Sequence, residues 1–181
     1  MINVYFDSIK NTLDKMDKQQ IYLVTYFIRN CFGNIYIFGN GGSAATASHF
    51  AQDLNKMADK RCICLNDNIP SILAYGNDVG FESIFKLQLS KLIQDGDIVI
   101  GISCSGNSRN ITDAIAYAKE RGCNTIGFMG FDGGILKSLV DYFIHVPLDD
   151  MQVCEDIHLI ITHTILKLLK FDLPTWKDNK K

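Results

Sequence analysis

The sequence is poor in proline and carries no excess of charge of either sign. Its 181 residues include 3 prolines and 14 glycines, too few for a collagen-like or disordered chain. The 18 basic and 20 acidic side chains leave a formal net charge of −2. A general nucleic-acid binder, or a protein held to anionic membranes, needs an excess of Lys and Arg. No apolar run reaches the ~18 residues that span a bilayer, so we expect neither nucleic acid nor a membrane as a partner.

Paired cysteine motifs are also missing. None of the six cysteines belongs to a CxxC motif, and most lie inside apolar stretches. Cys62 and Cys64 form a CxC pair, but no second pair of ligands follows nearby. The first residues, MINVYFDSIKNTLDKMDK, are amphipathic and lack the apolar core of a signal peptide. We therefore expect reduced, buried thiols and a cytoplasmic location.

What the sequence does contain is an alternation of short apolar strands and helices. Residues 1–30 carry apolar positions at helical spacing, as one long helix or two short ones. Beyond them the pattern predicts strands at 34–38, 61–65, 71–75, 97–102, 124–128 and 142–146, and helices at 43–57, 81–93, 108–121, 135–139 and 151–171. Such alternation is typical of βαβ units, so we predict an α/β fold with a parallel sheet between layers of helices. This domain covers residues 31–171 and is followed by a loose tail at 172–181.

Two loops at the expected carboxyl ends of strands are rich in groups that bind phosphate. The first is GNGGS at 39–43, whose glycines let the backbone approach a ligand in front of a helix N-terminus. The second is SCSGNS at 103–108, in which Ser103, Ser105 and Ser108 can each donate to a phosphate oxygen. Neither loop is a dinucleotide fingerprint or a Walker loop. Either loop alone could be only a helix cap or tight turn, but two at one sheet edge favour a phosphorylated ligand.

Two of the predicted helices carry ionisable side chains. His49 and Asp53 are four residues apart and share a helix face. The last helix carries Glu155, Asp156, His158 and His163. Asp156 is seven residues from His163 and nearly aligned with it, so helical spacing favours Asp156 over Glu155 as its neighbour. If the two helices face each other, imidazoles and carboxylates could form a metal site or an acid/base pair.

The motifs together resemble a known family. FGNGGSAATASHFAQDL, YGNDVGFESIF, GDIVIGISCSGNSRNI, GFDGG and EDIHLIITHTI stand in the order and spacing of a sugar isomerase (SIS) domain. They are similar to the phosphoheptose isomerases, which convert sedoheptulose 7-phosphate to D-glycero-D-manno-heptose 7-phosphate. The resemblance runs from about residue 30 to 170. It implies a doubly wound, flavodoxin-like three-layer fold and a cytoplasmic homotetramer that acts in lipopolysaccharide or capsule synthesis.

The resemblance also implies roles for individual residues. Those matching the family's motifs are Asn40, Gly41 and Gly42 in the substrate loop, Asn77 and Asp78 at the sugar, Ser103, Cys104, Ser105 and Ser108 at the phosphate, and His49, Asp53, Glu155 and His163 as ligands of one zinc ion per subunit. Asp53 and Glu155 are further expected to contact substrate, and with His163 to be catalytic. Here the family pattern takes precedence over the helical spacing that favoured Asp156.

Three positions depart from the family's usual residues. Family members commonly have Glu in place of Asp53, Gln in place of Glu155 and Thr in place of Cys104. Asp53 is one methylene shorter, which withdraws its carboxylate by roughly 1.3–1.5 Å. Glu155 adds a negative charge in place of an amide. The catalytic base that moves a proton through a cis-enediolate is therefore either Asp53 or Glu155.

Other interpretations of the same residues remain. The SIS family includes non-catalytic, DnaA-binding initiator-associating scaffolds, and also isomerases of other phosphosugars. Ionisable groups beside the sugar loop argue against a scaffold. Phe6, Ile9 and Leu13 give the N-terminal helix an apolar side that could form an oligomer interface or pack on the chain's own sheet.

Overall fold

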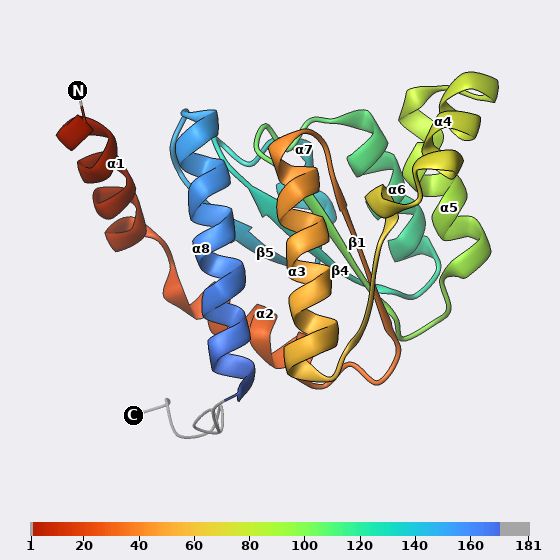
Figure 1. Ribbon diagram of the computed structural model, residues 1–181, viewed down its shortest axis with the longest axis horizontal. Coiled ribbons are helices and arrows are strands. Elements are labelled where there is room, and N and C mark those ends of the chain that lie inside the picture. The colour runs from red at the N-terminus through yellow and green to blue at the C-terminus, as the bar shows by residue number, and fades with distance from the viewer. Residues whose placement is uncertain (1, 171–181) are drawn as a thin grey trace.

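A computed structural model describes residues 2–170 of the chain (Figure 1). The predicted tail at 172–181 lies outside the described residues. In chain order the elements are α1 (Ile2–Lys15), α2 (Lys18–Arg29), β1 (Asn34–Gly39), α3 (Gly42–Ala58), β2 (Arg61–Cys64), η1 (Leu65–Asp67), α4 (Ile69–Asp78), η2 (Phe81–Ser83), α5 (Ile84–Leu92), β3 (Ile98–Ser103), α6 (Arg109–Glu120), β4 (Asn124–Met129), α7 (Gly134–Leu139), β5 (Tyr142–His145) and α8 (Met151–Lys170).

The five strands form one parallel sheet in the order β2-β1-β3-β4-β5. This is the flavodoxin-like order, and it confirms the predicted doubly wound fold. The central strand β3 is buried along its whole length, as its apolar sequence predicts for a strand covered on both faces. The strand that follows β1 in the chain, β2, lies on one side of it, and β3 and the later strands lie on the other. Such folds bind ligands where the strand order reverses in this way, here between β1 and β3.

Helices cover both faces of the sheet and enclose two apolar cores. One core joins the sheet to α2, α3 and α8, with Phe50, Ile28 and Ile157 fully buried. The other joins it to α5, α6 and α7 around Phe85 and Leu136. In Figure 1, α3 and α8 run side by side on the near face of the sheet, which agrees with the packing of these helices.

The N-terminal region forms two helices, and the first packs partly on the chain's own core. The carboxylate of Asp17 caps α2 by accepting a hydrogen bond from the Gln19 amide, which separates the two helices. Ile9 and Leu13 of α1 pack against the core, whereas Phe6 is exposed. Packing on the chain's own structure therefore accounts for two of the three apolar residues on that side.

One predicted strand is wrong. Residues 71–75 lie within α4, because Asn68 accepts a hydrogen bond from the Ser71 amide and Pro70 occupies the first turn. The predicted helix at 81–93 is divided into η2 and α5. The other predicted elements are present with bounds shifted by one or two residues. No helix within residues 2–170 is long and apolar enough to cross a membrane.

Candidate functional site

A small cavity of about 160 Å³ lies at the carboxyl ends of β1 and β3. Its walls come from both predicted loops and from α8: Asn40, Ser43, Ser103, Cys104, Ser105, Ser108, Phe131, Met151 and Glu155 are among the residues that line it. This volume is enough to hold a phosphate group. The lining includes no Lys or Arg. Hydroxyl groups and backbone amides are therefore the donors that this cavity offers to an anion.

The serine loop is folded tightly against the start of α7. Gly106 has a φ of +65°, and a Cβ atom there would collide with the carbonyl oxygen of Gly133. The Ser103 hydroxyl donates to the Ser108 hydroxyl over 3.3 Å, and the Ser105 hydroxyl accepts from the Asn107 amide over 3.2 Å. Because only glycine fits at position 106, the loop brings its hydroxyls to one side of the turn.

Glu155 points toward the cavity, whereas its neighbour Asp156 points away. A Cβ atom at Gly42 would collide with the carboxylate of Glu155, so this carboxylate lies against the first residue of α3. The positive end of a helix stabilises a carboxylate at this position. Asp156 instead accepts a 2.7 Å hydrogen bond from the hydroxyl of Tyr5 on α1, and this bond raises the pKa of Tyr5 to about 12. Helical spacing had favoured Asp156 as the neighbour of His163, but Asp156 is bonded to α1, and of the two carboxylates only Glu155 lines the cavity.

His49, Asp53 and His163 form a separate cluster farther along α3 and α8. The Nε2 atoms of His49 and His163 are 2.9 Å apart, and a carboxylate oxygen of Asp53 lies 3.5 Å from the first and 3.8 Å from the second. Their candidate ligand atoms all lie within 4.8 Å of one another. The two imidazoles are about half exposed, while the carboxylate is mostly buried. None of the three residues lines the cavity.

The donor set of this cluster fits a zinc ion. Two imidazoles and a carboxylate are a common set for catalytic zinc, which keeps a further position open. The two ring nitrogens that would bind the ion already face each other, beside the Asp53 carboxylate. The expected fourth ligand, Glu155, is not among these three residues: it lies eight positions before His163 on α8, about 12 Å along the helix axis. Its role as a ligand stays a prediction.

Known proteins resemble this chain over most of its length. A family model described as SIS domain matches residues 4–130. A phosphoheptose isomerase from Syntrophotalea carbinolica is 36% identical over 186 residues, covering 96% of this chain and 94% of the relative. One from Geobacter sulfurreducens is 40% identical over 141 residues, 75% of each chain. The structure of phosphoheptose isomerase from Neisseria gonorrhoeae has a TM-score of 0.88 and 28% identity, covering 93% of this chain and 97% of that one.

The chain belongs to the phosphoheptose isomerase family of SIS domains. This membership confirms the resemblance inferred from the sequence motifs, and it makes the chain an isomerase by family. Both loops that carried the resemblance lie at the cavity. Gly41 has a φ of +54°, which glycine adopts without strain, and Gly42 begins α3.

Two residues that the family pattern places at the sugar lie apart from the cavity. Asn77 and Asp78 end α4, are exposed, and bond to each other through the Asn77 amide over 2.8 Å. They do not line the cavity. Their contact with a sugar stays a prediction.

Cys104 takes part in the cavity as a protonated thiol. It is buried, and burial raises its pKa to about 11, although a contact with the Ser43 hydroxyl opposes that rise. A neutral thiol is a weak donor, so the backbone of the loop must supply more of the contact to an anion at this position.

Sequence reasoning did not assign Ser43, Phe131 or Met151 to the site. Ser43 is buried and faces the serine loop, and its place directly after GNGG is a signal that could have identified it. Phe131 follows β4 within GFDGG and has a φ of +52°. Its carbonyl accepts a hydrogen bond from His145 Nε2 over 3.0 Å. Met151 begins α8, and nothing in its local sequence distinguishes it.

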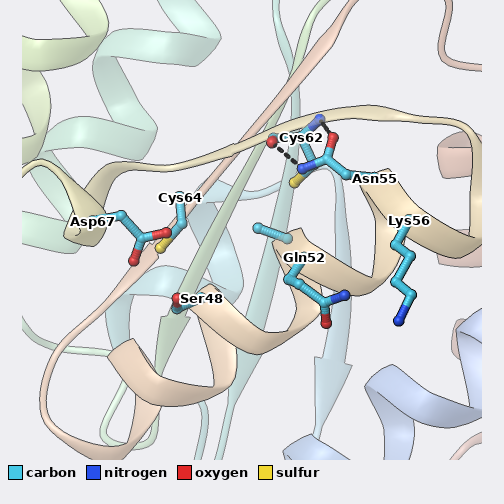
Figure 2. Close-up of a pocket in the computed structure, with 8 residues that line it drawn as sticks. Ser48, Gln52, Asn55, Lys56, Cys62, Cys64 and Asp67 are labelled. Carbon is cyan, nitrogen blue, oxygen red and sulfur yellow. Dashed lines mark hydrogen bonds between the residues drawn. The ribbon is translucent and has the colours of Figure 1, made fainter.

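A second, more open pocket of about 520 Å³ lies between α3 and the edge strand β2 (Figure 2). The side chain of Asn55 accepts from the Cys62 amide over 2.9 Å and donates to the Cys62 carbonyl over 2.7 Å. Cys62 and Cys64 face α3, and burial raises the pKa of both thiols, to about 11 for Cys64. All six cysteines of the chain are unpaired and buried, as predicted.

Proposed function

We propose that this chain converts sedoheptulose 7-phosphate to D-glycero-D-manno-heptose 7-phosphate, for the synthesis of heptose-containing surface glycans such as lipopolysaccharide or capsule. Its relatives at 36% and 40% identity carry the name phosphoheptose isomerase. The observation that carries the proposal is the cavity, in which four serine hydroxyls and a carboxylate meet at the sheet's switch point.

In this proposal the phosphate of the sugar occupies the serine-lined end of the cavity. Four hydroxyls, together with the amides that precede α6, replace the water around the phosphate oxygens. Because the phosphate is far from the reacting carbons, its binding energy serves to position the other end of the sugar.

Glu155 is the group proposed to move the proton. An aldose–ketose isomerase removes a proton from the carbon beside the carbonyl and returns it to the neighbouring carbon, through a cis-enediolate. Glu155 is partly buried and lies at the cavity wall, whereas Asp53 lies outside it. Of the two carboxylates that the sequence left open as the base, the geometry supports Glu155. His163 is also proposed to be catalytic: its Nε2 can either carry the proton between the two substrate oxygens or bind a metal ion, but not both at once.

His49, Asp53 and His163 are proposed to hold one zinc ion per subunit. The bound ion would polarise a substrate carbonyl as a Lewis acid. The mostly buried Asp53 carboxylate faces both imidazoles, which orients their Nε2 atoms toward the same point. His49 and His163 remain accessible for a substrate because about half of each ring is exposed.

The working unit is proposed to be a homotetramer in the cytoplasm. Glu155 lines the cavity, whereas His163, eight positions later on α8, does not. We propose that a neighbouring subunit brings its own cluster of His49, Asp53 and His163 to each cavity. The six unpaired thiols support a reducing compartment.

A direct assay tests this function. The purified chain is given sedoheptulose 7-phosphate and, in parallel, pentose and hexose phosphates, with and without added zinc. Conversion of the heptose with kcat/KM at least tenfold above that for the other sugars supports the proposal. Preference for a pentose or hexose phosphate assigns another phosphosugar, and conversion of none of them leaves the scaffold interpretation.

A further inference from the structure

Asn40 and Asn110 join the two loops of the cavity by a pair of reciprocal hydrogen bonds. The Asn40 side-chain amide donates to Asn110 Oδ1 over 3.0 Å, and the Asn110 amide donates to Asn40 Oδ1 over 2.8 Å. Asn40 follows β1 in the GNGGS loop, and Asn110 is the second residue of α6, directly after the serine loop. Asn110 is 3% exposed.

This pair acts where the sheet no longer holds the two segments together. The pairing of β1 with β3 ends at Gly39 and Ile102, so it does not hold the loops that follow. On the other side, Asn66 holds Gly39 in the same reciprocal way, accepting from its amide over 3.0 Å and donating to its carbonyl over 2.9 Å. Asn66 therefore fixes the backbone just before Asn40, and Asn110 fixes the Asn40 side chain.

Asn110 has no other evident task in the site. It does not line the cavity, whereas Asn40 does. It is not the N-cap of α6, because Ser108 holds that position. Its side-chain donor and acceptor are both directed to Asn40, and without these partners the buried amide would be left with unsatisfied polar groups.

We propose that Asn110 is a positioning residue for substrate binding: it fixes the side chain of Asn40 at the sugar-phosphate cavity. This inference rests on the proposed function, because it takes the cavity to be the substrate site. The amide of Asn40 has two donor hydrogens and two acceptor lone pairs, of which the pair with Asn110 uses one each. Asn40 lines the cavity, where the remaining donor or acceptor is available to a sugar hydroxyl.

The substitution Asn110→Asp separates this role from a merely structural one. It keeps the size and shape of the side chain but removes the donor while the new carboxyl is ionised. One oxygen can still accept from Asn40, but the other then faces Asn40 Oδ1, and two acceptors repel each other. Protonation restores a donor, so the loss of Asn40 positioning reverses as the pH falls. Burial raises the pKa of a carboxyl, which brings the reversal toward the range in which the enzyme can be assayed.

The experiment measures kcat and KM for sedoheptulose 7-phosphate from pH 8 to pH 5, and the binding of the same sugar by calorimetry. For Asn110→Asp we expect a KM about tenfold above wild type at pH 8, the size of one lost hydrogen bond, with kcat changed less. The ratio of variant to wild-type KM should fall toward 1 at pH 5. Asn110→Ala should show a raised KM at every pH. Ionisable groups that both proteins share contribute equally to the two pH profiles, so the ratio isolates the introduced carboxyl.

The matched control is Asn11→Asp, which introduces the same charge on the exposed surface of α1 and should leave KM unchanged. A KM ratio for Asn110→Asp that stays constant across the pH range, or stays near 1 throughout, overturns the positioning role. If wild type binds the sugar but does not convert it, the proposed function fails. The ratio of variant to wild-type dissociation constants from calorimetry then replaces the KM ratio as the test of the positioning role. A wild-type chain that neither binds nor converts the sugar overturns both.

Discussion

The Nε2 atoms of His49 and His163 lie 2.9 Å apart, although 114 residues separate them in the sequence. At this distance one ring donates and the other accepts, so the two facing nitrogens share one hydrogen. Asp53 lies against both rings and favours that arrangement. The packing of α3 on α8 therefore creates a group that neither helix could provide alone.

Removal of the His163 imidazole should abolish most of the activity without unfolding the chain. We expect His163→Ala to lower kcat at least ~10²-fold, the usual contribution of an acid–base group. Its ring is half exposed, so little packing is lost. Lys167→Ala, one helical turn farther on and exposed, is the matched control and should keep wild-type turnover. Near-normal turnover of folded His163→Ala would remove this residue from the mechanism.

Metal content should depend on the cluster but not on Glu155. Protein purified without chelator should contain about one zinc ion per chain, measured by elemental analysis. Asp53→Asn and His49→Ala should lose most of it, because each removes one of three ligands. Glu155→Gln should retain it, because Glu155 is not one of the three clustered residues. Full activity with almost no metal per chain would contradict the zinc role.

Proton abstraction should depend on the carboxylate at the cavity. In heavy water, wild type should incorporate deuterium at the reacting carbon of the product, as followed by NMR. Glu155→Gln should lose this exchange, whereas Asp53→Asn should retain it at a reduced rate, because only Glu155 lines the cavity. Asp156→Asn, which changes a carboxylate bonded to Tyr5, is the control. Exchange that persists in both Glu155→Gln and Asp53→Asn shows that neither carboxylate is the base.

Mixed oligomers should show whether one site draws on two subunits. Glu155→Gln and His163→Ala chains, carrying different tags, are expressed together and the hybrids are isolated. If each site takes Glu155 from one subunit and His163 from another, equal random mixing restores about a quarter of wild-type activity. A hybrid of His49→Ala with His163→Ala should stay inactive, because both changes damage the same cluster. Absence of recovery in the first hybrid places the whole site within one chain.

The sequence predicted the sheet well because apolar runs such as residues 98–102 suit only a strand buried on both faces. Both cavity loops were predicted for the same reason, since the ends of parallel strands share one edge. Residues 71–75 were misassigned because their short apolar pattern fits strand or helix, and the deciding contact is the cap from Asn68.

Tertiary packing decided what local spacing could not. Glu155 and Asp156 are adjacent, and only the position of Tyr5 on α1 shows which carboxylate is already bonded. The separation of Glu155 from the His49–Asp53–His163 cluster likewise depends on which turns of α3 and α8 meet. Asn110 escaped notice because a single asparagine near a helix start has many ordinary roles.

The buried imidazole of His158 should make the fold sensitive to acid. His158 is fully buried, its Nε2 lies 3.3 Å from the Met129 carbonyl, and its Nδ1 has no partner. Burial lowers its pKa to about 4, below the ordinary value of about 6.5. Between these two pH values the unfolded chain therefore binds a proton that the folded chain does not. The free energy of unfolding falls as the pH drops from 6.5 to 4, by roughly 3 kcal/mol over the whole range.

His158→Gln keeps a donor for the Met129 carbonyl. Between pH 7 and pH 4.5 its free energy of unfolding should fall less than that of wild type, measured by urea denaturation at one protein concentration. An equal loss in both proteins would show that His158 is not the group responsible.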